Sequence, residues 1–245
     1  MHRVDEDQLV GELTALWGMA AGTVTGPGDD CAVWRAAPSN TVSVAKVDAV
    51  VEKVHFRSQD AAARVGYKAL GRVISDFGAM GATPIHALVT IGFPFKSRPE
   101  RWLKDCYRGM AKLAEKYTIG LAGGELTQSN QIWINLSLFG YVRESHMILR
   151  SGGNTGDALY VTGKLGGSFP KRHLAFQPRL SEGQWLARRG VSAMMDLSDG
   201  LGKDLLRLAA ASECSFAIQP ECIPRHRGCS IQQAINDGED YELLF

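Results

Sequence analysis

Hydrophobic residues in the first half of the chain follow two spacings, one typical of helices and one typical of strands. The β-branched run at 41–51 favours a strand, and Ile132, Ile134, Leu136 and Leu138 alternate with polar residues, which predicts a strand with one buried face. We expect helices over residues 5–17, 60–80 and 100–117, and strands over residues 41–51, 85–93, 118–122 and 131–142. From residue 41 the order is strand, helix, strand, helix, strand, strand, which is typical of an α+β domain.

A polar, glycine-bearing stretch, RSGGNTGD at 150–157, separates this half from the next. We therefore predict an N-terminal α+β domain over 1–149 and a C-terminal α/β domain over 150–245. In the second domain we expect strands over 158–163, 193–198, 216–220 and 241–245, and helices over 179–189 and 199–211. The last strand, YELLF, has no turn or polar tail behind it, so we expect the second domain to be incomplete at its C-terminal end.

Composition excludes several classes of protein. The 245 residues are 45% hydrophobic and 22% charged, as in soluble globular proteins. A formal net charge of +1, with no basic block longer than Arg188-Arg189, argues against nucleic-acid binding. No stretch approaches the ~18 apolar residues of a membrane span. Five cysteines without C-x-x-C spacing indicate reduced thiols, and together with an acidic start that lacks a signal peptide they predict a cytoplasmic protein without membrane association.

Six short acidic motifs lie between apolar segments along the whole chain. They are GPGDDCAV (26–33), KVDAVVEKVHF (46–56), ISDFGAMGA (74–82), GGE (123–125), DLSDGLGKDL (196–205) and DGEDYELLF (237–245). Any one of them alone is most simply a tight turn or a helix cap. Together they place carboxylates at the predicted ends of strands and starts of helices, where α/β proteins assemble sites. Two carboxylates about 4 Å apart repel by roughly 4 kcal/mol, so a cation is expected among them.

Carboxylate oxygens without accompanying histidine or cysteine favour Mg²⁺, Mn²⁺ or Ca²⁺ over zinc. Mg²⁺ is commonly held together with a phosphate, and Ser198, Asp199 and Gly200 begin a predicted helix whose N-terminus favours anions. A complex of Mg²⁺ and a nucleotide is the natural inference. The usual nucleotide motifs are absent, however: Ala158 stands where a G-x-x-x-x-G-K-[ST] motif needs its first glycine.

The motifs, in this order, closely resemble the thiamine-monophosphate kinase family, within the AIR-synthase-like (PurM-like) ATP-binding superfamily. The resemblance runs from about residue 26 to the last residue, and GEDYELLF is its most specific string. It implies a two-domain PurM-like architecture and a homodimer that pairs through its N-terminal domains. It also implies that ATP and several Mg²⁺ ions are held by acidic residues between the domains.

The resemblance assigns roles to individual positions. It implies six metal ligands: Asp30, Asp48, Asp76, Glu125, Asp196 and Asp199. It implies nucleotide contacts at Tyr107, Gly124, Arg150 and Ser198, and contacts to thiamine monophosphate at His55 and Glu239. The activity it implies is ATP-dependent phosphorylation of thiamine monophosphate to thiamine diphosphate, by in-line transfer without a protein nucleophile.

Other functions stay open at this point. One is an ATP-dependent synthetase or ligase of the same superfamily with another small-molecule substrate, and another is a truncated, non-catalytic nucleotide-binding remnant. The chain also departs from the family pattern at three places. Lys46 and Val47 precede Asp48 where hydroxyl residues are usual, Glu125 replaces an aspartate, and residues 163–180 form a shorter segment than in the family.

Overall fold

The computed structural model describes residues 6–25, 33–34 and 38–245, which fall into two compact units. The first unit holds most of the chain up to Tyr141, and the second consists of residues 40–42, 74–83 and 142–245. Residues 74–83 therefore group with the C-terminal part of the chain. The domain division at residues 149 and 150 stays a prediction.

The first unit is built on a four-stranded sheet in the order β3-β6-β4-β5. Its strands are β3 (Thr41–Val51), β4 (Thr83–Phe93), β5 (Gly120–Gln128) and β6 (Trp133–Arg143). The alternation predicted for β6 is confirmed, since Ile132, Ile134, Leu136 and Leu138 are all fully buried. A separate antiparallel pair joins β1 (Thr23–Thr25) to β2 (Val33–Trp34).

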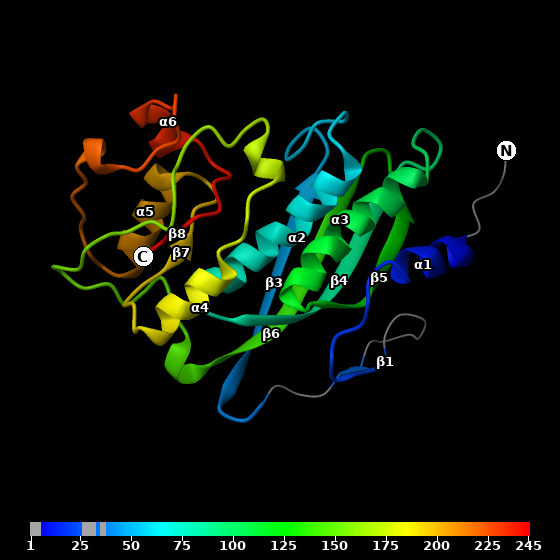
Figure 1. The fold of residues 1–245 in the computed structure, drawn as a ribbon, viewed down its shortest axis with the longest axis horizontal. Coiled ribbons are helices and arrows are strands. Elements are labelled where there is room, and N and C mark those ends of the chain that lie inside the picture. The colour runs from blue at the N-terminus through cyan, green and yellow to red at the C-terminus, as the bar shows by residue number, and fades with distance from the viewer. Residues whose placement is uncertain (1–5, 26–32, 35–37) are drawn as a thin grey trace. The chain divides into compact units, whose positions relative to one another are not determined.

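Two helices, α2 (Ala62–Ala79) and α3 (Arg101–Tyr117), lie on one face of this sheet (Figure 1). They pack closely because glycines stand at their contacts. A Cβ atom on Gly66 would lie 2.0 Å from the carbonyl oxygen of Cys106, and one on Gly109 would lie 1.9 Å from that of Ala63. No side chain fits at such distances, so the two glycines set how near the helix backbones approach. A shorter helix, α1 (Glu6–Thr14), precedes them.

The second unit contains three further helices and a short antiparallel strand pair. The helices are α4 (Leu180–Arg188), α5 (Leu201–Ala211) and α6 (Ile231–Asn236), and the strands are β7 (Met195–Asp196) and β8 (Leu243–Leu244). Short 3₁₀ turns lie at Glu144–His146, Arg172–Leu174 and Pro220–Cys222. One apolar cluster packs β7, β8 and the inner face of α5, through Met195, Leu205 and Leu244 among others.

Most predicted elements are present, but two predicted strands are not. Residues 158–163 form only one bridge, between Val161 and Leu244, although Tyr160 and Phe245 exchange backbone hydrogen bonds of 2.8 and 3.0 Å. Residues 216–220 form no strand, because the described residues offer their backbone no neighbouring strand to pair with. The predicted strands 193–198 and 241–245 shrink to two residues each. In contrast, β5 runs beyond residue 122 to Gln128, because it stays paired with β4 to that point.

Among the described residues, no helix combines the length and the apolar character that a membrane crossing requires.

Candidate functional site

Asp48 lies on β3 in the first unit and is paired with an arginine of α2. The Nη2 atom of Arg72 lies 3.1 Å from each carboxylate oxygen of Asp48, and its Nη1 atom donates to the carbonyl oxygen of Ala49 at 2.8 Å. Arg72 therefore supplies a positive charge to this predicted metal ligand. Val47, which departs from the family pattern, is 55% exposed beside it.

His55 lies in a tight turn after β3 that is held from two sides. Its Nδ1 atom accepts a hydrogen bond from the amide of Val51 at 3.1 Å, so the neutral ring carries its proton on Nε2. Its carbonyl oxygen accepts from Nζ of Lys68, a fully buried lysine of α2, at 2.7 Å. The position of the imidazole is thus fixed by backbone contacts.

Glu52 braces the start of the same turn. Its carboxylate accepts from Arg98 at 2.5 Å and from the amide of Ile132 at 3.3 Å. Burial by itself raises the pKa of Glu52, but hydrogen bonds from Ser58 and Ile132 and the charge of Arg98 outweigh it, and the pKa is lowered overall. Glu52 is therefore ionised in the folded chain at neutral pH.

Gly124 and Glu125 lie on β5, both exposed, next to a register shift in the pairing with β4. A Cβ atom on Gly124 would lie 1.9 Å from the carbonyl oxygen of Val89, so this glycine is required by the neighbouring strand itself. Tyr107 lies on the buried side of α3, only 7% exposed, and burial raises the pKa of its phenol. Its hydroxyl stays neutral at physiological pH.

In the second unit, the last turns of α2 carry Asp76, and the residue before it contacts another predicted ligand. Ser75 is fully buried, and its hydroxyl donates to Oδ2 of Asp196 on β7 at 2.8 Å. Asp196 itself is only 4% exposed, whereas Asp76 is half-buried. The structure therefore brings together the segments that carry Asp76 and Asp196.

Ser198 and Asp199 form the turn between β7 and α5, and a further carboxylate lies behind them. Asp204, in the first turn of α5, accepts from the amides of Ser198 and Asp199 at 3.0 and 2.9 Å. Burial raises the pKa of Asp204, an effect that the amide of Asp199 and the charge of Arg207 oppose. Arg207 also lies 2.6 Å from the carboxylate of Asp199. Asp204 belongs to the acidic motif at 196–205, but its residue type alone assigns it no role.

Glu239 is joined to this turn by the backbone. Its amide donates to the carbonyl oxygen of Ser198 at 2.8 Å, and its carboxylate accepts from the hydroxyl of Tyr241 at 3.1 Å. Glu239 and Tyr241 have φ angles of 68° and 53°, in the left-handed region that costs a non-glycine residue about 1–2 kcal/mol. One backbone hydrogen bond thus links Ser198, a predicted nucleotide contact, to Glu239, a predicted contact to thiamine monophosphate.

Asp240, the next residue, fastens a neighbouring loop. It is 6% exposed and accepts from the amide of Gly166 at 2.9 Å, from the hydroxyl of Ser168 at 2.5 Å and from Nη2 of Arg172 at 2.9 Å. Sequence reasoning gave Asp240 no role and treated residues 163–180 only as a short segment. The carboxylate of Asp240 in fact holds residues 166–172 of that segment against residues 237–241, which precede β8.

For two of the predicted site residues the structure describes no side-chain contact. Asp30 lies outside the described residues. Arg150 is exposed, and its carbonyl oxygen accepts from the hydroxyl of Ser212 at 2.7 Å.

The carboxylates fit a hard cation by their chemistry, since the predicted ligands supply oxygen atoms only. Within the described part of the chain, however, no group of three or more acidic, histidine or cysteine side chains is arranged to hold a metal. The carboxylates of Asp48 and Asp199 contact arginines instead. The residue type therefore suits Mg²⁺, while the metal-ligand assignments stay predictions.

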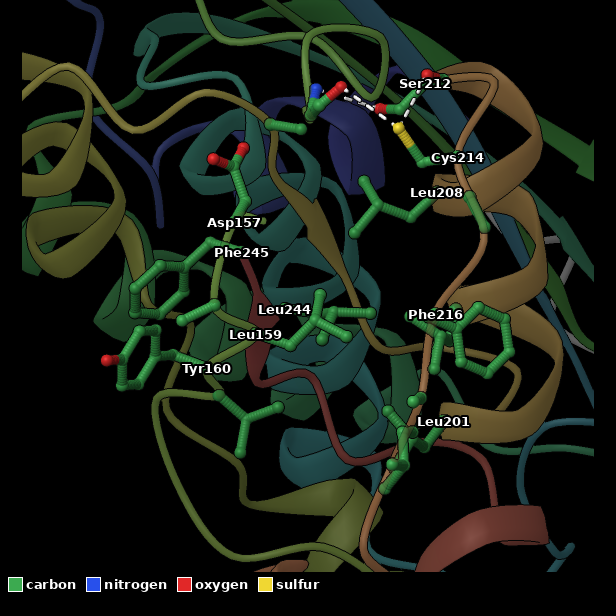
Figure 2. Close-up of a pocket in the computed structure, with 18 of the residues that line it drawn as sticks. Asp157, Leu159, Tyr160, Leu201, Leu208, Ser212, Cys214, Phe216, Leu244 and Phe245 are labelled. Atoms are coloured by element: carbon green, nitrogen blue, oxygen red, sulfur yellow. Dashed lines mark hydrogen bonds between the residues drawn. The ribbon is translucent and has the colours of Figure 1, made fainter. Parts of the chain in front are cut away.

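The second unit also contains a cavity of about 770 Å³ (Figure 2). Tyr160 and Phe245 stack on one side, and Phe216 stands across from them, with Leu201, Leu208 and Leu244 in between. None of the predicted site residues lines it. Its lining includes Phe216, Ala217, Ile218 and Gln219, which the sequence had placed in a strand.

Comparison with known proteins defines the class. Residues 28–142 match the family model described as AIR synthase related protein, N-terminal domain. A thiamine-monophosphate kinase from Stenotrophomonas maltophilia K279a superposes with a TM-score of 0.82 at 25% identity, over 98% of this chain and 83% of that one. The mixed α/β, PurM-like fold predicted from the sequence is confirmed, and residues 28–142 are similar to the N-terminal domain of AIR-synthase-related proteins.

Sequence similarity narrows the class to one family. Thiamine-monophosphate kinase from Rhodopirellula baltica is 36% identical over 239 residues, which cover 90% of this chain and 75% of that protein. The structure of AaThiL complexed with AMPPCP and TMP has a TM-score of 0.79 and 28% identity, over 89% of this chain and 78% of that one. The chain belongs to the thiamine-monophosphate kinase family, which is a family of phosphotransferases.

Proposed function

We propose that this chain transfers the γ-phosphoryl group of ATP to thiamine monophosphate and so forms thiamine diphosphate. The observation that carries the proposal is the hydrogen bond from the amide of Glu239 to the carbonyl oxygen of Ser198, 2.8 Å long. It joins the residue expected at the acceptor to the residue expected at the nucleotide. Direct transfer needs its two substrates side by side, and a relative with both kinds of ligand bound supports this reading.

In the proposed reaction, a phosphate oxygen of thiamine monophosphate attacks the γ-phosphorus of ATP in line with the bond that breaks. A new P–O bond forms to the acceptor, and the bond from the γ-phosphorus to the bridging oxygen of the β-phosphate breaks and leaves ADP. The acceptor supplies its own nucleophile. The protein is therefore left with binding, orientation and charge compensation.

The chain's residues divide between these tasks. Glu239 and His55 orient the acceptor; Nε2 of neutral His55 carries a proton and can donate it to a phosphate oxygen. The four residues proposed to contact ATP are Tyr107, Gly124, Arg150 and Ser198. Arg150 is exposed, and its guanidinium suits a transferring or leaving phosphate.

Mg²⁺, when bound, would neutralise phosphate charge during the transfer. The proposed ligands are Asp30, Asp48, Asp76, Glu125, Asp196 and Asp199. In the described structure Arg72 and Arg207 pair with two of them, Asp48 and Asp199. A cation bound by Asp48 or Asp199 would share the carboxylate with its arginine or displace that arginine.

We also propose that the chain works as a cytoplasmic homodimer paired through its N-terminal domain. On the sheet of the first unit, Val47 and its alternating neighbours Ser43 and Ala45 are exposed on β3, as expected for a surface that another chain covers. The mass of the protein in solution, measured by light scattering against the 26.6 kDa of one chain, tests the dimer.

The activity is tested by incubating the purified chain with thiamine monophosphate, ATP and Mg²⁺ and measuring thiamine diphosphate by chromatography. We expect product only when all three are present, with one ADP formed per diphosphate. ATP consumption without thiamine diphosphate would instead favour a synthetase or ligase with another substrate. Nucleotide binding without any turnover would favour a non-catalytic protein.

A further inference from the structure

The turn at Ser198 and Asp199 is held from behind by a carboxylate that has no part in the site as proposed above. Asp204 is fully buried, and its Oδ2 atom accepts from the amides of both turn residues, at 3.0 and 2.9 Å. Two amide groups of consecutive residues converging on one oxygen fix the orientation of both peptide planes. The backbone that carries Ser198 and Asp199 is therefore set by Asp204.

The second oxygen of Asp204 is engaged as well. Its Oδ1 atom accepts from Nη1 of Arg207 at 2.7 Å, and Nη2 of the same guanidinium lies 2.6 Å from the carboxylate of Asp199. One arginine thus contacts the side chain of the turn and the residue that holds its backbone. Since the amides of Ser198 and Asp199 and the guanidinium occupy both oxygens, Asp204 is a fixed part of the turn.

We infer that Asp204 is a positioning residue for nucleotide and metal binding: it holds the 198–199 turn in the geometry that presents Ser198 and Asp199, without contacting a ligand. The inference rests on the proposed function, which assigns those two residues to ATP and Mg²⁺. A purely structural role would be to stabilise the start of α5, with no effect on binding beyond that of a less stable fold.

Replacing Asp204 with asparagine separates the two roles. Asparagine has nearly the same shape but only one acceptor oxygen and a donor group in place of the other. If the side-chain oxygen of the asparagine accepts from the two backbone amides, its NH₂ group faces Arg207. If the side chain is flipped, the NH₂ group faces the two amides instead. Either orientation sets donor against donor, so the turn must shift.

Asp240 provides a matched control in the same unit. It is also buried, also accepts from a backbone amide and also accepts from an arginine, through Gly166 and Arg172. Asp240→Asn removes the same charge and the same kind of buried hydrogen bonds, but acts on the loop at 166–172. It therefore measures what loss of a buried carboxylate does to Mg-ATP binding when the carboxylate that accepts from the amides of Ser198 and Asp199 is kept.

The test compares wild type, Asp204→Asn and Asp240→Asn by calorimetric titration with Mg-ATP, by thermal unfolding, and by hydrogen exchange of the amides of Ser198 and Asp199. We expect Asp204→Asn to weaken Mg-ATP binding on the order of tenfold or more, which corresponds to the loss of one charge-assisted hydrogen bond. We expect the two amides to exchange faster in this variant alone. Asp240→Asn should lower the melting temperature similarly and leave the Mg-ATP affinity within about threefold of wild type.

Three results would overturn the inference. One is an Asp204→Asn protein that binds Mg-ATP as wild type does, and another is an equal loss of affinity in both variants. The third is unchanged exchange at the two amides. Failure of the proposed function looks different: wild type then binds Mg-ATP but makes no thiamine diphosphate, and the Asp204 comparison keeps its meaning. Wild type without any affinity for Mg-ATP contradicts both.

Discussion

The hydroxyl of Ser75 donates a hydrogen bond of 2.8 Å to the carboxylate of Asp196, and both side chains are buried. Ser75 is next to Asp76 on α2, and Asp196 ends β7, so two proposed metal ligands lie on segments joined by one short contact. Hydrogen bonds to charged groups in the interior stabilise more than neutral ones, at about 1.5–3 kcal/mol each. This contact therefore serves both the fold and the placement of the carboxylates.

Ser75→Ala removes that donor. We expect the free energy of unfolding to fall by about 1–3 kcal/mol, because Asp196 is left in the interior with one hydrogen bond fewer. Urea titration followed by circular dichroism measures it. Ser181→Ala, at an exposed position of α4, is the control and should change stability by less than about 0.5 kcal/mol. Equal stability of Ser75→Ala and wild type would show that the bond contributes nothing.

Asp76→Asn should abolish metal-dependent binding of ATP, because the proposed metal-binding carboxylate loses its charge while its shape is kept. The affinity for Mg-ATP is measured by calorimetry. Asp105→Asn, on the surface of α3 among arginines of its own helix, should bind as wild type does. Unchanged affinity in Asp76→Asn would refute the assignment of Asp76 as a ligand.

Glu125→Asp should be tolerated, since it restores the shorter carboxylate that the family usually has and Glu125 is exposed on β5. We expect Mg-ATP affinity to change by less than about threefold. Glu125→Ala, which has no carboxylate, should weaken binding by roughly tenfold or more. If the alanine variant binds as tightly as the aspartate variant, Glu125 is not a metal ligand.

Acid should destabilise the protein in part through Glu52. Its pKa is below the ordinary value of 4.5 in the folded chain, so the folded state holds fewer protons there than the unfolded state does. The resulting stabilisation is complete above about pH 4.5 and is lost as the pH falls through the lowered value.

Melting temperatures of wild type and Glu52→Gln, measured from pH 3 to 7, test this. The difference between the two proteins should be largest at neutral pH and should shrink below about pH 4.5. Glu115→Gln, at an exposed position of α3, provides the comparison and should follow wild type throughout. A constant difference between wild type and Glu52→Gln across the range would exclude Glu52 as a source of acid sensitivity.

The long periodic segments could be predicted from the sequence because their signal is local. The three helices of the first unit and the alternation of β6 depend only on which residues repeat along one element. Residues 216–220 have the same apolar composition as a strand, but a strand exists only where another backbone pairs with it. That partner is a tertiary fact, which composition does not contain.

The candidate site shows the same limit. The acidic motifs were recognisable because several carboxylates near glycines are unusual together. The different roles of the individual carboxylates could not be predicted, since Asp199 and Asp204 stand five positions apart in one motif and are the same residue type. Only the direction of the Ser198 and Asp199 amides shows that Asp204 faces the backbone.

Glu239 and Tyr241 occupy backbone conformations that glycine or asparagine would adopt at lower cost. A laboratory selection of random variants for heat resistance alone would favour replacing Glu239, which is only partly buried, and the replacement would remove the proposed acceptor contact. Tyr241 is buried and stacks on Phe176, so loss of its side chain would cost more stability than the relieved backbone strain returns. At Glu239, thermal stability and the proposed chemistry therefore impose opposite demands on the same backbone.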